Sequence, residues 1–140
     1  MSFDISKLNS PLDLSSGEWI EDIEDNPGLR LKVRSQRYKF YKSALERASR
    51  KAGKRSISDK DFGAILSEYI LLDWDFKDAD GPLVLMDGGK PLPYSKELAD
   101  NILASEDEYG IGALWRTAVI TASNDLSDRI VSATKDAAGN

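Results

Sequence analysis

Acidic side chains crowd one short stretch of this chain in a way that suggests metal binding. The stretch is residues 70–96, ILLDWDFKDADGPLVLMDGGKPLPYSK, and its first four acids are Asp73, Asp75, Asp78 and Asp80. An EF-hand loop needs oxygen ligands at positions one, three and five, glycine at six and glutamate at twelve. With Gly81 at position six, Phe76 falls at position one and Asp87 at position twelve, so the ligand set is incomplete. We therefore expect turn-capping aspartates, and a looser divalent site of Asp75, Asp78 and Asp80 is the alternative.

Catalytic chemistry has few other groups to use. The chain has no histidine and no cysteine, which excludes Ser-His dyads, thiol nucleophiles, disulfides and thiolate metal sites. Paired carboxylates such as Asp73 and Asp75 can act as acid and base, but their segment holds no other catalytic residue type. We predict a protein that is not an enzyme and that needs no metal or cofactor.

Length and composition predict one folded domain. The chain has 140 residues, of which 41% are hydrophobic and 31% charged, values typical of a globular protein. No apolar run approaches the roughly 20 residues that span a bilayer, and residues 1–13 lack the pattern of a secretion signal. We expect a flexible arm over residues 1–17, a single globular domain over 18–130 and a polar tail that frays over 131–140, without a membrane partner.

The net charge of −5 hides an uneven distribution. Residues 30–55 hold eleven Lys or Arg and one acid, which makes this segment +10 and leaves −15 for the rest. Such a split predicts a polar partner, a neighbouring copy of the chain or nucleic acid. The tyrosines of this basic segment fall on an apolar stripe and so are expected to face the core, away from the cations. Because the whole chain is also acidic, we do not expect nucleic acid to be the partner. The candidate partner-binding cations are Arg37, Lys42 and Arg50.

Hydrophobic periodicity predicts an α+β fold that is mainly helical. Residues 29–33 alternate apolar and cationic side chains, follow the turn sequence Asn-Pro-Gly and face the acidic residues 18–24, which predicts an N-terminal β-hairpin. A short second hairpin is expected around residues 87–89. Apolar spacings of three and four predict the helices.

Four helices are expected, and the helix ends carry recognisable capping residues. The first covers residues 36–52 and stops at Gly53; the second starts after Ser58 and runs to about residue 70, into the acidic loop. The third covers residues 96–104 after Ser95. The fourth begins near residue 107 and is expected to bury one face: Ile111, Leu114, Trp115, Ala118, Val119 and Ala122.

Three aromatic residues, Trp74, Phe76 and Tyr94, flank the acidic loop. Two interpretations are open. They close the core beneath the loop, because aromatic side chains carry a large buried area, or they form an exposed patch that binds a partner.

Two short motifs bracket that loop: LLDWD at residues 71–75 and GKPLPYS at residues 89–95. Together with FDISKLNSPLDL, SGEWIEDI, GLRLKVR and a tyrosine-rich basic helix, they follow one another over residues 3–122. This layout resembles the tail assembly chaperones of long-tailed bacteriophages and prophages. In that family the first motif ends a helix and the second starts one, and residues 83–86 look like an insertion into the loop.

The resemblance implies a non-enzymatic protein in the cytoplasm of a bacterial host, absent from the mature virion. Such a chaperone binds the long, helical tape measure protein, keeps it soluble and helps to recruit tail tube subunits. Opposite charges in different segments also predict self-association into oligomers. Two alternatives are a structural tail or head–tail joining component of the virion, and a small nucleic-acid-binding regulator that uses residues 30–55.

Overall fold

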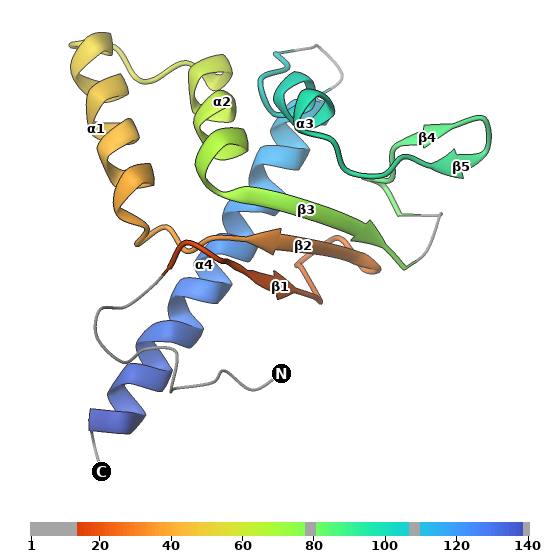
Figure 1. The fold of residues 1–140 in the computed structure, drawn as a ribbon. Helices are drawn as coiled ribbons and strands as arrows, with labels where there is room; N and C mark the ends of the chain where they lie inside the picture. Colours follow the sequence, from red (N-terminus) through yellow and green to blue (C-terminus); the bar gives the residue numbers. More distant parts are fainter. Residues whose placement is uncertain (1–13, 78–80, 107–109, 139–140) are drawn as a thin grey trace.

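The computed structural model describes residues 14–77, 81–106 and 110–138, with the side chains described as far as residue 135 (Figure 1). The elements in chain order are β1 (Glu18–Ile20), β2 (Leu29–Val33), α1 (Lys39–Ala52), α2 (Asp59–Tyr69), β3 (Leu71–Phe76), β4 (Met86–Asp87), β5 (Lys90–Pro91), α3 (Lys96–Leu103) and α4 (Ile111–Ala138). The predicted α+β fold that is mainly helical is confirmed. The predicted arm over residues 1–17 lies largely outside the described residues.

A three-stranded antiparallel sheet, in the order β1-β2-β3, forms one layer of the fold. The predicted N-terminal hairpin is present, with Glu18 opposite Val33 and Ile20 opposite Leu31. The alternation in β2 works as expected, because Leu29, Leu31 and Val33 are buried while the cations between them lie on the other face. The sheet therefore has one apolar face to cover.

The prediction of a helix end and loop over residues 71–76 is wrong, because this segment is the strand β3. Asp73 pairs with Lys32 and Asp75 with Arg30, so two of the four aspartates face cations across the ladder. The register shifts between Lys32 and Val33, and such an irregularity brings Leu71 and Trp74, three residues apart, both to the buried side. The expected helix end came from the resemblance of LLDWD to the chaperone family, and β3 does not follow that pattern.

Helices cover the sheet and each other (Figure 1). The α1 helix starts three residues later than predicted, because residues 35–38 form a turn in which the Tyr38 amide donates to the Ser35 carbonyl at 3.0 Å. The predicted end of α1 at Gly53, where φ is +64°, and the N-cap of α2 by the Ser58 hydroxyl are confirmed. The second short hairpin, β4–β5, and the Ser95 cap of α3 are also present.

The longest helix, α4, runs behind the sheet and extends beyond it at its C-terminal end (Figure 1). Of its predicted buried face, Trp115, Ala118, Val119 and Ala122 are at most 1% exposed, whereas Leu114 is 53% exposed and does not belong to the core. The helix starts at Ile111 and continues to Ala138, so it includes most of the segment that we expected to fray.

None of the helices in the described ranges combines the length and the apolarity that crossing a bilayer requires.

Candidate functional site

The three candidate aromatics come together in the core beneath β3. Trp74 is only 4% exposed and packs against Trp115, with ring centroids 5.1 Å apart, and against Tyr94 at 5.0 Å. The Trp74 indole donates a hydrogen bond of 3.0 Å to the Leu92 carbonyl. Phe76 and Tyr94 are half-buried at the edge of the same cluster. Of the two interpretations left open by the sequence, the structure favours closure of the core.

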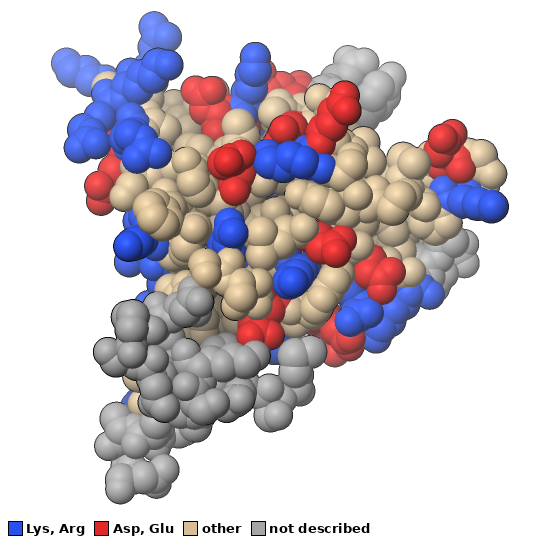
Figure 2. Space-filling view, viewed as in Figure 1, with Lys and Arg blue, Asp and Glu red and all other residues tan. Residues whose placement is uncertain are grey.

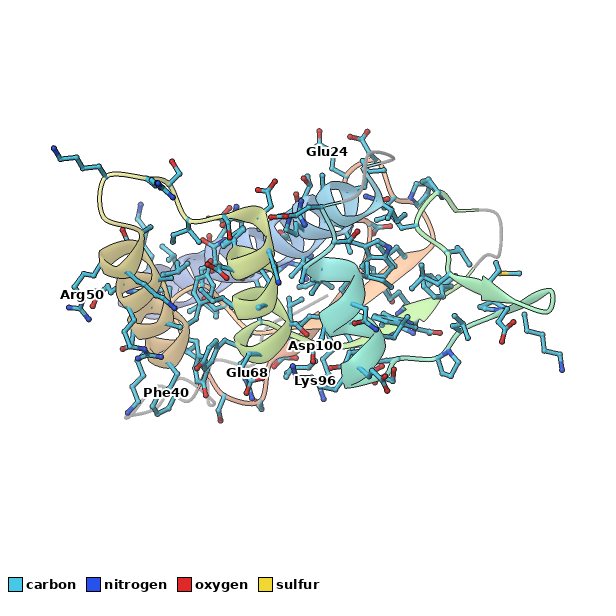
Figure 3. The ribbon with its side chains drawn as sticks, turned by 90° about the horizontal axis from the view of Figure 1, so that it is seen from above. Glu24, Phe40, Arg50, Glu68, Lys96 and Asp100 are labelled. Carbon is cyan, nitrogen blue, oxygen red and sulfur yellow. The ribbon has the colours of Figure 1, made fainter. Side chains whose placement is uncertain are left out.

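A second cluster joins α2 to α3 and has the residue types of a serine–lysine dyad (Figure 3). The Lys96 ammonium lies 3.4 Å from the Ser67 hydroxyl and 3.1 Å from the Glu68 carboxylate, and it also contacts Asp100. Ser67 is 1% exposed and donates its hydrogen bond to Asp100. The cluster is therefore tied to the packing of two helices.

The protonation state of Lys96 argues against catalysis there. Partial burial lowers the pKa of Lys96, but the hydrogen bonds and charges of Asp100 and Glu68 outweigh it, so the pKa is raised overall. A lysine held in its charged form cannot take the proton from Ser67. We assign this cluster a structural role.

Metal binding finds no support within residues 14–77, 81–106 and 110–138, where no three acidic side chains gather closely enough to hold an ion. Asp78 and Asp80, which the looser divalent site needs, lie outside the described residues. The alternative of a divalent site stays a prediction.

Cationic side chains gather at the end of the molecule formed by α1 and the loop after it (Figure 2). The three predicted contacts, Arg37, Lys42 and Arg50, are all exposed, and no ion pair to them exists among the described residues. In Figure 3 the Arg50 side chain points away from the body of the protein. The structure thus leaves these charges available to a partner.

The cations Arg30, within β2, and Arg34, directly after it, come from the same basic segment but contact other parts of the chain. The Arg30 guanidinium is 3.0 Å from Glu21 and 3.0 Å from Asp75, and that of Arg34 donates to the carbonyls of Ser15 and Tyr69. These charges hold the sheet and its surroundings together. Arg30 and Arg34 therefore stabilise the fold, whereas the cations of α1 remain available to a partner.

The aromatics of the basic helix divide in the same way. Tyr41 is 4% exposed and faces the core, as predicted, whereas Phe40 is 51% exposed. The Phe40 ring packs edge-on against Tyr38, with centroids 5.4 Å apart, and the Lys39 ammonium lies 5.0 Å from its centroid. An exposed aromatic among cations is typical of a binding surface.

A groove between α1 and α2, with a volume of about 500 Å³, opens on this cationic end. We call it the α1–α2 groove. Its apolar lining is Ala44, Ala48, Ala52, Ile65 and Tyr69; α1 and the following loop add Arg47, Lys51 and Arg55; the other side has Ser56, Ser58 and Asp61.

Neither this groove nor the cations beside it were predicted from the sequence. The signal was present, because Ala44, Ala48 and Ala52 repeat every four residues beside Arg47, Lys51 and Arg55, which repeat at the same interval. Alanines leave room along a helix face, and cations three residues further on flank that room. None of the candidate cations Arg37, Lys42 and Arg50 lines the groove.

At the far end of the molecule the β4–β5 hairpin projects from the body (Figures 1 and 3). All residues from Met86 to Pro91 are exposed, and Met86 has 44% of its surface in solvent. Gly88 and Gly89 form the tip with φ of +59° and +80°, and a Cβ at either position would meet no atom within 4 Å. The tip is therefore narrow.

Comparison of the chain with protein-family models, with curated proteins and with solved structures found no match.

Proposed function

We propose that this chain is a tail assembly chaperone of the kind found in long-tailed phages and prophages. It binds the tape measure protein in the cytoplasm of the bacterial host, keeps it soluble, helps to recruit tail tube subunits and is absent from the mature virion. The sequence support is the resemblance carried by LLDWD at residues 71–75 and GKPLPYS at residues 89–95.

The structural observation that carries the proposal is the available charge on α1. Lys42 and Arg50 are exposed and have no ion pair in the described part of the chain, whereas Arg30, Lys77, Lys96 and Arg129 are each paired. Cations that the fold itself does not use suit an acidic partner, which they would attract over about 8–10 Å at physiological salt. A long amphipathic helix with acidic flanks is such a partner.

Co-expression with the neighbouring large, helix-rich tail protein tests this function. The wild-type chain should raise the soluble fraction of the large protein and co-purify with it. The variant Lys42→Glu with Arg50→Glu should lose most of this capture, because two of the three available charges are reversed.

A matched control is Lys60→Glu with Lys135→Glu, which makes the same change in net charge at exposed positions on α2 and α4. This control should capture the large protein as the wild type does. If the large protein stays insoluble with the wild-type chain and nothing co-purifies, the chaperone proposal is wrong. Stoichiometric presence of the chain in purified particles would instead support a structural virion component.

One observation favours nucleic acid as a second candidate partner. Phe40 is 51% exposed with the Lys39 ammonium over its ring, and bases stack on such aromatics at about 1–3 kcal/mol each. A single-stranded RNA probe tests it: binding should weaken steeply with salt and fall further in Phe40→Ala. No retardation of the probe at low salt would exclude this candidate.

A further inference from the structure

Two surface features lie at opposite ends of the molecule. The α1–α2 groove opens between the first two helices, and the β4–β5 hairpin projects on the other side of α3 (Figures 1 and 3). The hairpin strands pair with each other through Met86–Pro91 and Asp87–Lys90. A feature that projects at one end and a hollow at the other can meet only between two copies of the chain.

The shapes of the two features match. The hairpin offers one large exposed hydrophobic side chain, Met86, behind a tip of two glycines without side chains. The groove offers an apolar floor whose alanines leave space, among them Ala48 and Ala52. Methionine adapts its shape to irregular apolar hollows, and a narrow tip can enter a groove of about 500 Å³.

The charges of the hairpin and the groove are also complementary, because each feature carries both acidic and basic side chains. Asp87 and Lys90 stand directly opposite each other across the hairpin, so its two strands carry opposite charges. The groove has Arg47, Lys51 and Arg55 toward α1 and Asp61 on α2. In one orientation the Asp87 carboxylate meets the cations while the Lys90 ammonium meets Asp61. The reverse orientation would place like charges together, which costs binding energy.

We infer that the β4–β5 hairpin of one copy docks in the α1–α2 groove of the next copy. The contact joins two different surfaces, so a pair of copies keeps one free hairpin and one free groove, and assembly continues into a filament or closes into a ring. This inference stands independently of the proposed function, because neither surface includes Lys42 or Arg50.

The contact is small. One hairpin in one groove falls below the roughly 1,200 Å² of standard protein–protein interfaces, in the class of weak and transient complexes. Its charge pairs are near solvent, so salt should weaken it further. If the proposed function holds, chains bound side by side on one long partner would meet at a high effective concentration, which compensates for weak pairwise affinity.

Two differently disabled variants test the inference by complementation in sedimentation velocity. The hairpin variant is Met86→Ser with Asp87→Ser, and the groove variant is Arg47→Glu with Lys51→Glu. At low salt the wild type should form larger species as concentration rises, whereas each variant alone should be a monomer, with association weakened about tenfold or more. Mixed, they should form a dimer that does not grow, because one intact groove meets one intact hairpin.

The matched control is Lys42→Glu with Arg50→Glu, which reverses two charges on the same helix outside the groove and should assemble as the wild type does. Circular dichroism should show that every variant is folded, since all the changed positions are exposed. The inference is overturned if the wild type stays a monomer at low salt and high concentration, if the variants associate alone, or if their mixture gives no dimer. A groove variant that loses capture of the large tail protein while the wild type is a monomer would instead assign the groove to that partner.

Discussion

Trp74 shows how burial decides the role of a residue that sequence leaves open. Its ring contacts Trp115 and Tyr94, and its indole hydrogen bonds to Leu92. We expect Trp74→Ala to lower the free energy of unfolding by about 3–5 kcal/mol, the usual loss for a buried aromatic truncated in a packed core. Chemical denaturation, followed by circular dichroism, measures it.

The exposed Phe40 is the control for this prediction. Phe40→Ala should change the free energy of unfolding by no more than about 0.5 kcal/mol, because surface substitutions rarely cost more. If Trp74→Ala proved as stable as Phe40→Ala, Trp74 would not be a core residue, and the partner-binding interpretation of Trp74, Phe76 and Tyr94 would return.

For the substitution Gly63→Ala, packing and helix propensity predict opposite changes in stability. It lies within α2, where alanine is normally favoured over glycine by about 1 kcal/mol. However, a Cβ at this position would stand 1.8 Å from the Leu103 carbonyl oxygen at the end of α3. We therefore expect Gly63→Ala to destabilise the fold by about 1–3 kcal/mol through forced separation of the two helices.

Its neighbour Ala64 is exposed on the same helix and provides the comparison. Ala64→Gly should cost about 1 kcal/mol through propensity alone. Thermal unfolding of both variants is the measurement. An increase in stability for Gly63→Ala would mean that α2 and α3 are not in close contact at this point.

At the level of secondary-structure elements, the starts of α2 and α3 could be predicted because their signals are local. The Ser58 hydroxyl accepts from the Asp61 amide and the Ser95 hydroxyl from the Leu98 amide, both at 3.1 Å. A serine directly before an apolar stripe of helical period can be recognised in the sequence as the N-cap of a helix. The same holds for the turn at Gly53 and for the alternation within β2.

The strand β3 could not be predicted, because its partner and its bulge are not local properties. Its pairing with β2 brings together residues about 40 positions apart, such as Leu31 and Trp74. The α1–α2 groove was missed for a related reason. The spacing of Ala44, Ala48 and Ala52 can be read from the sequence, but whether a neighbouring helix fills the space beside them depends on tertiary packing.

The effect of a serine-to-alanine substitution on stability should depend on whether the serine caps a helix or lies inside one. Ser58→Ala and Ser95→Ala should each lower the free energy of unfolding by about 1 kcal/mol, because each removes the acceptor of a helix N-terminal amide. Ser49→Ala, at an exposed position inside α1, should leave stability unchanged or raise it by about 0.5 kcal/mol. Urea denaturation distinguishes them, and equal effects at all three sites would argue against the caps.

For the whole molecule, the absence of histidine and cysteine shapes the response to pH. No side chain of the chain has an ordinary pKa between about 5 and 8, so its stability should be nearly constant in this range. This separates it from most proteins of similar size, in which histidines change charge there.

At acidic pH the fold should lose stability through its carboxylates. Lys77, through a hydrogen bond and its charge, lowers the pKa of Glu21 below its ordinary value of 4.5. Partial burial opposes ionisation of Asp100, yet hydrogen bonds from Lys96 and Ser67 lower its pKa below 3.8. A lowered pKa in the folded state gives stability that is present above the unfolded pKa and is lost as pH falls through the folded one. Unfolding temperatures should therefore drop below about pH 4.

At alkaline pH the fold should lose stability through a different set of groups, whose pKa values are raised in the folded state. Burial raises the pKa of Tyr41 above its ordinary value of 10.0, and the pKa of Lys96 is raised above 10.5 because the acids around it outweigh its burial. A raised pKa in the folded state gives stability that is complete below the unfolded pKa and is lost as pH rises through the folded one. The unfolding temperature should therefore fall above about pH 10, and less steeply in Tyr41→Phe, which keeps the buried ring but cannot ionise. Thermal unfolding by circular dichroism from pH 3 to 11 measures the full profile. An unfolding temperature that changed between pH 5 and 8 would contradict this account, because no side chain here could cause it.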